Sequence, residues 1–441
     1  MSLWSESPEQ LRLALLEAGL HRGWLLTVPG TRVVRASHPL LAPLAAAIQA
    51  DARDYHGHQA VFFEIGAASG FLLSAAVHRT VRGQAAGGVR FWVYDTVEAF
   101  VRDGLRLARG MGHKNALAGL WWGGGKGVVA RRPGVDHTDP AVRRAVYNDY
   151  GRFMTGIRGC YVTAEDAGTT TEDMADVFAT TRHTTCIPER LGGSGNPSRL
   201  TATGVVVGME AALHHLGMGD LEGKTVAMQG LGNVARFMIR DLCQRKVGRI
   251  VGTDVDERAI ELTQAMNPEA PLEARVVPLG DASVLAEKAD IVAPNAVGAV
   301  LNARTIPTVQ APIVCGAANN QLEDHGRDGP ALQARGVLYC PDFLVNRMGI
   351  VNCANECYGS FDGDPAIQSH LDHGTEHGIF QRSLEVFRRA ATSGLHPAEE
   401  AVRLAEELGA VPHPIWGNRG QQIIDFLVES RWAEQGVLGA K

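Results

Sequence analysis

Two lysines stand in glycine-rich segments where their side chains could do chemistry. Lys114 lies in the segment 109–116 (RGMGHKNA), and Lys126 lies in the segment 123–127 (GGGKG). Glycines around a lysine leave room for the close approach of another molecule. Two lysines near one pocket lower each other's pKa, and burial lowers it further. A lysine whose pKa lies near neutral can act as a general base, which a solvated lysine cannot do.

Asp166 lies in a segment that favours presentation of a carboxylate at a cleft. A strand-like run at 161–162 leads into Glu165 and Asp166 and then into the turn 167–170. Loops held by a rigid scaffold carry a disproportionate share of catalytic residues. Each of these features alone is more typical of a solvated lysine or a simple turn. Their meaning therefore depends on what lies beside them in the fold.

The glycine run around Lys126 superficially resembles a phosphate-binding loop, but it is not a Walker A motif. Leu120 occupies the position of that motif's first glycine. Gly127 replaces the Ser or Thr that would bind magnesium. The run is therefore not interpreted as a phosphate-binding loop.

A dinucleotide-binding motif occurs at 230–235 (GLGNVA), between a strand expected at 225–229 and a helix. The first glycine of such a motif permits a tight turn, and the second lets the backbone approach a pyrophosphate at the helix N-terminus. Asp254 ends the next expected strand, about 20 residues beyond the motif, where a carboxylate binds the ribose hydroxyls and repels a 2′-phosphate. The pattern favours NAD over NADP. The residues expected to bind NAD here are Gly230, Gly232, Asn233, Val234 and Asp254.

The surrounding sequence predicts an α/β protein with two domains and a cleft between them. From about 200 to 345, short buried runs alternate with helical segments, which predicts a doubly wound parallel sheet of the Rossmann type. Before it, mixed strands and a helix at 95–120 predict an α/β domain for substrate binding and oligomerisation. The expected segments are 1–198 with an extension of unspecified role at 1–55, the Rossmann domain at 199–350, and helices at 351–441 that return to the catalytic domain. The expected strands are 62–66, 71–77, 225–229, 250–254, 290–294, 311–315 and 336–340.

The composition excludes several functional classes. The 441-residue chain has a formal net charge of −6, whereas a protein that binds the phosphate backbone of nucleic acid would carry a basic surplus. No apolar run approaches the roughly 20 residues needed to cross a bilayer, and the first residues lack the pattern of a secretory signal. The seven cysteines include no CxxC pair, and their odd number suits a reducing compartment. We therefore expect a cytoplasmic protein with neither nucleic acid nor membrane as a partner.

The chain resembles the Glu/Leu/Phe/Val dehydrogenase family of amino-acid dehydrogenases. The strings that carry the resemblance follow the family's order over roughly residues 58–425. So many motifs in one order make the match far more specific than the dinucleotide motif alone. Among these strings are RLARGMGHKNALAGLWWGGGKGVV, YVTAEDAGTTTEDM, GSGNPSRLTATGVV, VAMQGLGNVARF, CGAANNQLED and NRMGIVNCANE.

This resemblance implies NAD-dependent, reversible oxidative deamination of an L-amino acid to a keto acid and ammonia by a homo-oligomer. Lys114 would bind the substrate carboxylate, with help from Asn319 or Asn320. Lys126 would be the base that activates water, and Asp166 would handle protons at the amine. Hydride leaves the substrate Cα for the nicotinamide, and water then attacks the resulting iminium. The remaining implied residues are Gly87 and Gly88 beside the substrate, and Thr201, Asn295 and Ala296 beside the nicotinamide.

The side-chain pocket is predicted to be apolar. Family members that use glutamate place a lysine directly before the Gly-Gly pair, where this chain has Ala86. A buried carboxylate without a cation would cost several kcal/mol, so a leucine-, valine- or phenylalanine-like substrate is expected. The residues that match the pocket positions of the family are Ala86, Met111, Ala164, Ile350 and Cys353.

Two alternatives stay open at the level of sequence. Arg347 stands where the family often has alanine, and a guanidinium that entered the pocket would pair with glutamate or another acidic substrate. A chain that kept the fold and lost the chemistry would be a silent, nucleotide-binding regulatory paralogue, although such a protein would not need Lys114, Lys126 and Asp166. Trp121-Trp122 also replaces smaller residues before the glycine run, and we interpret this pair as a packing or subunit contact.

A histidine-rich segment is interpreted as a polar turn. His370, His373 and His377 have a spacing that can bind a metal on a helix. Gly374 lies between them and weakens a helix there. Cys353 and Cys357 likewise make no complete zinc site. No metal is expected.

Overall fold

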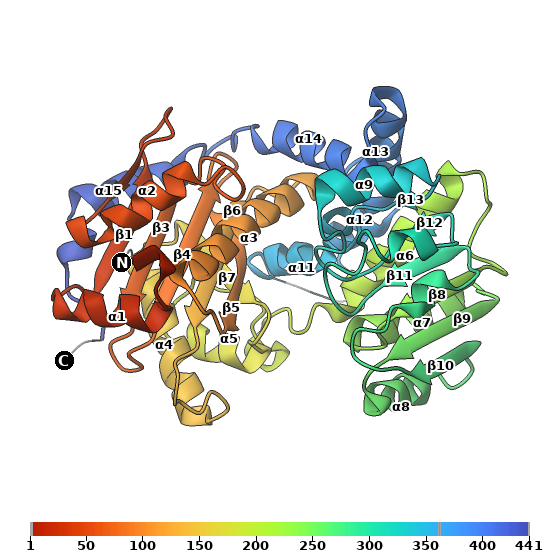
Figure 1. Cartoon of the computed structure of the whole chain (residues 1–441), viewed down its shortest axis with the longest axis horizontal. Helices are drawn as coiled ribbons and strands as arrows, with labels where there is room; N and C mark the ends of the chain where they lie inside the picture. Colours follow the sequence, from red (N-terminus) through yellow and green to blue (C-terminus); the bar gives the residue numbers. More distant parts are fainter. Residues whose placement is uncertain (1–2, 360, 362, 440–441) are drawn as a thin grey trace.

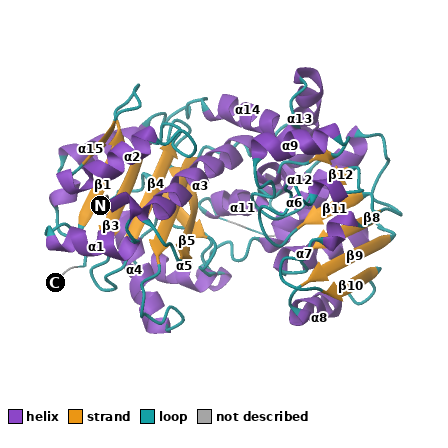
Figure 2. Ribbon diagram, in the orientation of Figure 1, coloured by secondary structure: helices purple, strands orange, loops and turns teal. Residues whose placement is uncertain are grey.

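The computed structural model of the chain describes residues 3–359, 361 and 363–439. Two α/β bodies lie side by side, each built around one sheet, and the C-terminal helices run along both (Figure 1). Helices flank each sheet, as Figure 2 shows. The predicted α/β class with a Rossmann-type body is confirmed. Within the described residues, no helix combines the length and the apolar character needed to span a bilayer.

The first sheet contains β1 (Arg22–Thr27), β2 (Val34–Ala36), β3 (Ala60–Ile65), β4 (Leu72–Arg79), β5 (Ala85–Trp92), β6 (Gly123–Ala130) and β7 (Tyr161–Glu165). Its order is β2-β1-β3-β4-β6-β5-β7. β3 and β4 pair antiparallel, whereas β5 pairs parallel with both β6 and β7. Parallel strands present their carboxyl ends at one edge, so Asp166, which follows β7, lies at the same edge as the end of β5.

The N-terminal extension is part of this sheet and its core. β1 pairs antiparallel with β3, with Leu25 opposite Val61, and β2 adds the edge strand. Ser7 caps α1 (Pro8–Glu17), as its sequence pattern predicts, and α2 (Ala42–Ala50) follows. Apolar side chains of both helices pack in one buried cluster with β1 and β3. The extension, whose role the sequence left unspecified, thus completes the first of the two α/β bodies.

The glycine run of β6 serves internal packing. A Cβ at Gly125 would lie 2.4 Å from the ring of Tyr161, and one at Gly127 would lie 1.9 Å from the hydroxyl of Tyr150. Only glycine permits such close contact. The interpretation of these glycines as room for an approaching molecule is wrong at these two positions, because tyrosines of the protein fill the space. Lys126 points to the other face of the strand.

Helices position the ends of these strands. Thr96 caps α3, whose amphipathic sequence predicted a helix at 95–120. Asp139 caps the next helix. These helices and their successor are α3 (Val97–Leu117), α4 (Pro140–Gly156) and α5 (Thr171–Phe178).

The second sheet contains β8 (Thr225–Gln229), β9 (Arg249–Asp254), β10 (Leu272–Val276), β11 (Ile291–Pro294), β12 (Ile313–Val314) and β13 (Leu338–Tyr339). All neighbours are parallel, in the order β10-β9-β8-β11-β12-β13. Five of these strands were predicted. β10 was not, because this edge strand alternates exposed charges such as Glu273 with half-buried residues. The covering helices are α6 (Ser198–His215), α7 (Asn233–Gln244), α8 (Glu257–Met266) and α9 (His325–Ala334).

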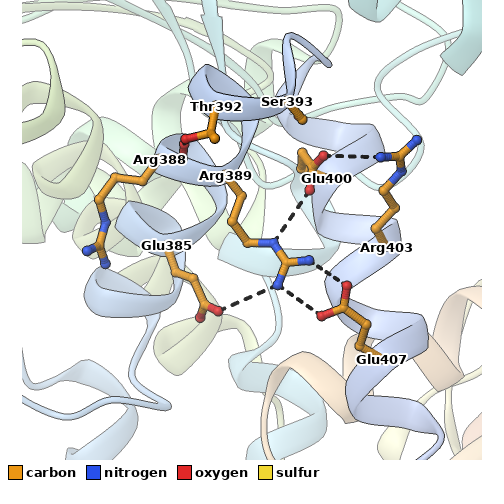
Figure 3. A pocket seen from close by; sticks show the side chains of 8 residues that line it. All are labelled: Glu385, Arg388, Arg389, Thr392, Ser393, Glu400, Arg403 and Glu407. Carbon is orange, nitrogen blue, oxygen red and sulfur yellow. Dashed lines mark hydrogen bonds and ion pairs between the residues drawn. The ribbon is translucent and has the colours of Figure 1, made fainter.

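The C-terminal helices join the two bodies. α13 packs on α6, and α14 packs on both α13 and α3. Glu406 of α14 accepts hydrogen bonds from His113 (2.9 Å) and Arg109 (3.2 Å) of α3. Between α13 and α14, Arg389 pairs with Glu400 and Glu407 in a surface hollow (Figure 3). These helices are α10 (Asp342–Val345), α11 (Met348–Glu356), α12 (Pro365–Leu371), α13 (Ile379–Ser393), α14 (Pro397–Gly409) and α15 (Arg419–Glu429).

Candidate active site

A cavity of about 870 Å³ lies between the two bodies. Its walls come from α3, the carboxyl ends of β5 and β7, the start of α6, and α11. The two bodies thus form the cleft that the sequence predicted. Of the predicted site residues, those that line it are Gly88, Met111, Lys114, Lys126, Ala164, Asp166, Thr201, Val234, Asn319, Asn320, Ile350 and Cys353. Ala86, Gly87, Gly230, Gly232, Asn233, Asp254, Asn295 and Ala296 lie outside its lining.

Lys126 and Asp166 meet inside this cavity. Nζ of Lys126 lies 2.9 Å from Oδ2 of Asp166, and Nε of Arg90 donates to the same oxygen at 3.0 Å. Burial alone would raise the pKa of Asp166, but the two cations overcome it and lower that pKa to about 2. Asp166 is therefore ionised at neutral pH. It is placed to stabilise a positive charge on a bound molecule.

Both lysines carry lowered pKa values. Burial lowers the pKa of Lys126, although the charge of Asp166 opposes the change. Burial also lowers the pKa of Lys114 to about 8, against the pull of Asp342. The proximity of Lys126 contributes a smaller lowering to Lys114. Desolvation, more than lysine–lysine repulsion, moves both groups toward neutral pH.

Lys114 faces the second α/β body across the cleft. Its Nζ donates to Oδ1 of Asn319 at 3.4 Å, and Nδ2 of Asn346 donates to the same oxygen at 2.8 Å. With Oδ1 engaged by two donors, the amide nitrogen of Asn319 is the group left to donate. Asn320 follows in a left-handed conformation (φ +53°), and its N–H donates to Oδ2 of Asp342 at 2.6 Å. A carboxylate between Lys114 and Asn319 would thus meet a cation and an amide donor.

The far wall of the cavity is apolar and contains a residue that the sequence interpretation missed. Met111, Ala164, Ile350 and Cys353 line this part, as predicted, together with Cys186. Cys186 lies on a segment that has no recognisable motif. A β-bridge between Thr163 and Thr184 holds this segment beside β7. No local pattern marks this contact. The Sγ atoms of Cys186 and Cys353 lie 3.0 Å apart.

The predicted Gly87-Gly88 pair brings the walls of the site together. A Cβ at Gly88 would lie 2.7 Å from Cβ of Asp166, and one at Gly87 would lie 2.9 Å from Cγ of Met111. Ala86 is buried with 1 % of its surface exposed. It shares the face of β5 with Gly88, because side chains alternate along a strand.

The guanidinium of Arg347 does not reach the cavity, so it is not placed to bind an acidic substrate. Its guanidinium donates to the carbonyl of Leu117 at 2.5 Å and to the carbonyl of His377. The side chain is fully buried, and it binds these two carbonyls instead of lining the cavity. The glutamate alternative that depended on Arg347 is corrected accordingly: the residue joins α3 to the segment before α13.

Trp121 and the histidine-rich segment 370–377 also lie away from the cavity. The ring of Trp121 packs against His413, with the Arg82 guanidinium 4.4 Å from its centroid. His373 stacks on Phe380. In the same segment, the rings of His370 and His377 lie 4.8 Å apart and form a separate contact.

Sequence reasoning also missed Arg90 and Glu165. Arg90 bridges Asp166 and Asp103, with 3.0 Å to each carboxylate. Glu165 lines the cavity, and Oε2 of this side chain is buried without a hydrogen-bond partner. Burial raises the pKa of Glu165 to about 7. The position of Glu165 directly before Asp166 was the available signal, whereas Arg90 in the string AAGGVRFW gave none.

The dinucleotide motif has the geometry that its sequence requires. Gly230 adopts φ +92°, and a Cβ there would lie 2.8 Å from Cβ of Ala296. Around Gly232 the space is open to 4 Å, and no side chain caps α7 at this residue. The first N–H groups of α7 are therefore free to bind phosphate oxygens.

The ends of the neighbouring strands complete this site. Oδ2 of Asp254 accepts from the N–H of Leu231 at 2.7 Å, which fixes the carboxylate beside the motif. Oδ1 of Asn295 accepts from the N–H of Ala317 at 2.8 Å, and its buried Nδ2 has no partner. An orphaned buried amide of this kind fits a carbonyl acceptor such as the carboxamide of a nicotinamide. The residues present therefore fit a dinucleotide.

Comparisons with known proteins agree with this geometry. Residues 64–183 match the Glu/Leu/Phe/Val dehydrogenase dimerisation domain, and residues 192–405 match Glutamate/Leucine/Phenylalanine/Valine dehydrogenase. The chain is 40 % identical over 340 residues to a leucine dehydrogenase of Bacillus subtilis, which covers 77 % of this chain and 88 % of the relative. This chain belongs to the Glu/Leu/Phe/Val dehydrogenase family. It is an amino-acid dehydrogenase, and the silent regulatory alternative is set aside.

Two further relatives support this assignment. A valine dehydrogenase of Streptomyces albus is 38 % identical over 355 residues, covering 80 % of this chain and 93 % of the relative. The structure of L-tryptophan dehydrogenase from Nostoc punctiforme matches with a TM-score of 0.65 and 30 % identity, covering 83 % of this chain and 97 % of that one. The named substrates of these members of the dehydrogenase family are apolar amino acids.

Proposed function

We propose that this dehydrogenase uses NAD to deaminate an apolar L-amino acid to its 2-keto acid and ammonia, in a reversible reaction. One observation carries the proposal: the Lys126–Asp166 pair shares a cavity with an apolar wall made by Met111, Ala164 and Ile350. The side chain of a leucine-, valine- or phenylalanine-like substrate would pack against that wall and leave the α-amino group beside Asp166.

The residues of the chain divide the chemistry among them. Lys114 and Asn319 would bind the α-carboxylate. A bound nicotinamide would supply the acceptor for hydride from the substrate Cα. The ionised Asp166 would stabilise the iminium left on the substrate, because a preorganised charge in a desolvated site is effective. Lys126, with its lowered pKa, would accept a proton from the attacking water.

The charges around the cavity favour an apolar substrate over glutamate. Each arginine in the lining already pairs with an acid: Arg90 and Arg106 with Asp103, and Arg109 with Glu406. The remaining one, at position 53, pairs with its neighbouring aspartate. A second carboxylate would thus enter the site without a free guanidinium and near the unpaired Glu165. Burial of such a carboxylate is costly.

The preference for NAD rests on Asp254. A carboxylate at the end of β9 would accept the ribose hydroxyls and repel a 2′-phosphate. We also propose a homo-oligomer, which the match to a dimerisation domain supports. A cytoplasmic location agrees with the unpaired cysteines of the described residues.

A substrate panel tests the proposal. Apolar and acidic L-amino acids are supplied with NAD or NADP, and the matching keto acids with ammonia and the reduced cofactors, while absorbance of the reduced cofactor is followed. We expect turnover with an apolar amino acid and NAD, with kcat/KM on the order of 100-fold above that for glutamate. Higher kcat/KM for glutamate would refute the substrate assignment, and preferential use of NADP would refute the cofactor assignment.

A further inference from the structure

The cleft wall contains a pair of thiols that the proposed chemistry does not use. The Sγ atoms of Cys186 and Cys353 lie 3.0 Å apart, and both side chains line the cavity. Their exposed fractions are 2 % and 3 %. A small reagent would therefore reach these thiols through the substrate cavity and not from the outer surface.

The two cysteines lie on the two segments by which the chain passes between the domains. Cys186 belongs to the segment that leads from α5 into α6, and Cys353 lies on α11, after the last strand of the second sheet. Glu356 of α11 already joins these segments, because its Oε2 accepts from the N–H of Ser194 at 2.7 Å and of Ile187 at 3.3 Å. A disulfide between Cys186 and Cys353 would covalently link the two segments that connect the domains.

The local geometry suits a disulfide. A bonded pair of sulfurs lies about 2.05 Å apart, so these atoms must approach by roughly 1 Å. Cys186 has φ +59°, a left-handed conformation that costs a non-glycine residue energy and that the surrounding structure must hold. The hydrogen bonds of Glu356 supply part of this restraint and keep Cys186 facing α11.

We propose that Cys186 and Cys353 form a redox-active dithiol site, which a small uncharged disulfide oxidises to an intramolecular disulfide that slows turnover. One protein thiolate attacks a reagent sulfur, the reagent S–S bond breaks, and one thiol leaves. The second protein thiolate attacks the mixed disulfide and releases the other. Two protein thiols are oxidised, one reagent disulfide is reduced to two thiols, and the protein protons pass to the leaving thiolates. The kinetic effect rests on the proposed function, whereas the disulfide does not.

Oxidation should accelerate as the pH rises. Contact with Cys186 and burial raise the pKa of Cys353 well above its usual range, and the nearby charge of Glu356 adds to the effect. Thiolate is the attacking species, so the reaction is followed as the pH is raised to and above about 8.5, the ordinary pKa of cysteine. Cys315 and Cys340 provide a matched comparison, because they are neighbouring, fully buried thiols outside the cavity lining.

The experiment treats the full-length protein with bis(2-hydroxyethyl) disulfide and maps the linked peptides by mass spectrometry without reduction. We expect a peptide that joins Cys186 to Cys353 and a fall in kcat on the order of tenfold, since small misplacements of site groups are costly. Dithiothreitol should reverse both. Cys186→Ser and Cys353→Ser should each abolish the linked peptide, because the remaining thiol can go no further than the mixed disulfide, and Cys340→Ser should keep the linked peptide.

Four outcomes are informative. Modification of the exposed Cys357 without a Cys186–Cys353 peptide would overturn the dithiol site. A linked peptide with unchanged kcat would overturn the effect on turnover. Equal linkage of Cys315 to Cys340 would overturn access through the cavity. If the reagent produces the linked peptide but the untreated, reduced protein shows no turnover with apolar amino acids, the dithiol site stands and the proposed function fails.

Discussion

The Lys126 ammonium and the Asp166 carboxylate form an ion pair inside the cleft, with Nζ 2.9 Å from Oδ2. Each group opposes the effect of burial on the other: Asp166 raises the pKa of Lys126, and Lys126 lowers the pKa of Asp166. A change at either residue should therefore alter the protonation of both. Arg90 adds a third charge: it donates a hydrogen bond to Asp166 at 3.0 Å, and its charge also lowers the pKa of Lys126.

Asp166→Asn should remove turnover while the nucleotide site stays intact. The iminium would lose its stabilising charge, and the pKa of Lys126 would fall further without its anionic partner. We expect kcat to fall by about 100-fold or more, the scale on which preorganised electrostatic groups act. Steady-state kinetics give kcat, and NADH fluorescence reports cofactor binding. A variant with nearly unchanged kcat would show that Asp166 is not needed for charge stabilisation.

Arg90→Gln should shift the pH dependence of the enzyme. Arg90 lowers the pKa of Lys126 and of Asp166, so its loss should raise both pKa values. The acidic limb of the kcat/KM profile, which follows deprotonation of the base Lys126, should therefore move to higher pH. Arg106→Gln is the matched control, because Arg106 pairs with Asp103 at 2.9 Å but not with Asp166. Equal profiles for the two variants would contradict a positioning role for Arg90.

Cofactor preference should follow Asp254. In Asp254→Ser/Val255→Arg, the charge that repels a 2′-phosphate becomes one that attracts it. The ratio of kcat/KM for NADP to that for NAD should rise. Glu257→Gln, an exposed change in the first turn of α8, should leave this ratio near that of the wild type. A ratio that does not respond to the double change would mean that Asp254 does not contact the ribose.

Ala86→Lys should raise kcat/KM for glutamate and lower it for apolar substrates. Ala86 shares a face of β5 with Gly88, which borders the cavity, so a lysine there can extend its ammonium toward a substrate carboxylate. Without that carboxylate, the buried charge would be unpaired. Ala86→Met has a similar length without the charge and should give no gain with glutamate. An equal gain in both variants would refute the electrostatic explanation.

Arg347→Ala should affect stability more than specificity. The guanidinium satisfies the carbonyls of Leu117 and His377, and each buried group left unpaired costs about 1–3 kcal/mol. The Tm should fall, and the ratio of kcat/KM for apolar substrate to that for glutamate should stay constant. If the wild type preferred glutamate and Arg347→Ala lost that preference, Arg347 would bind the substrate carboxylate, contrary to its position in the structure.

Local sequence patterns predicted the parts of the fold that depend on local chemistry. β8 and the turn with Gly230 and Gly232 follow from a local strand–turn–helix pattern, and α3 follows from its apolar spacing. β10 was not predicted as a strand, because its half-exposed, charge-bearing sequence has the pattern of a loop. Local pattern is a strong predictor of a helix or buried strand and a weak one of an edge.

Contacts between distant segments account for the rest. β1 joins the sheet by pairing with β3, and the sequence of residues 22–27 alone does not predict this pairing. A bridge between Thr163 and Thr184 brings Cys186 to the cavity, and the pairing of β5 with β7 brings Arg90 to Asp166. Such pairings depend on the completed fold. The motif around Lys126 was recognisable, but the use of its glycines for packing against tyrosines was not.

The most direct test of Lys126 as the base compares Lys126→Ala with Lys114→Ala on the best substrate of the panel. We expect Lys126→Ala to lose nearly all kcat while NADH binding persists, because the attacking water would lack its base. We expect Lys114→Ala mainly to raise KM, since that lysine would bind the substrate carboxylate. A Lys126→Ala enzyme with kcat near that of the wild type would contradict the assignment of Lys126 as the base that activates water.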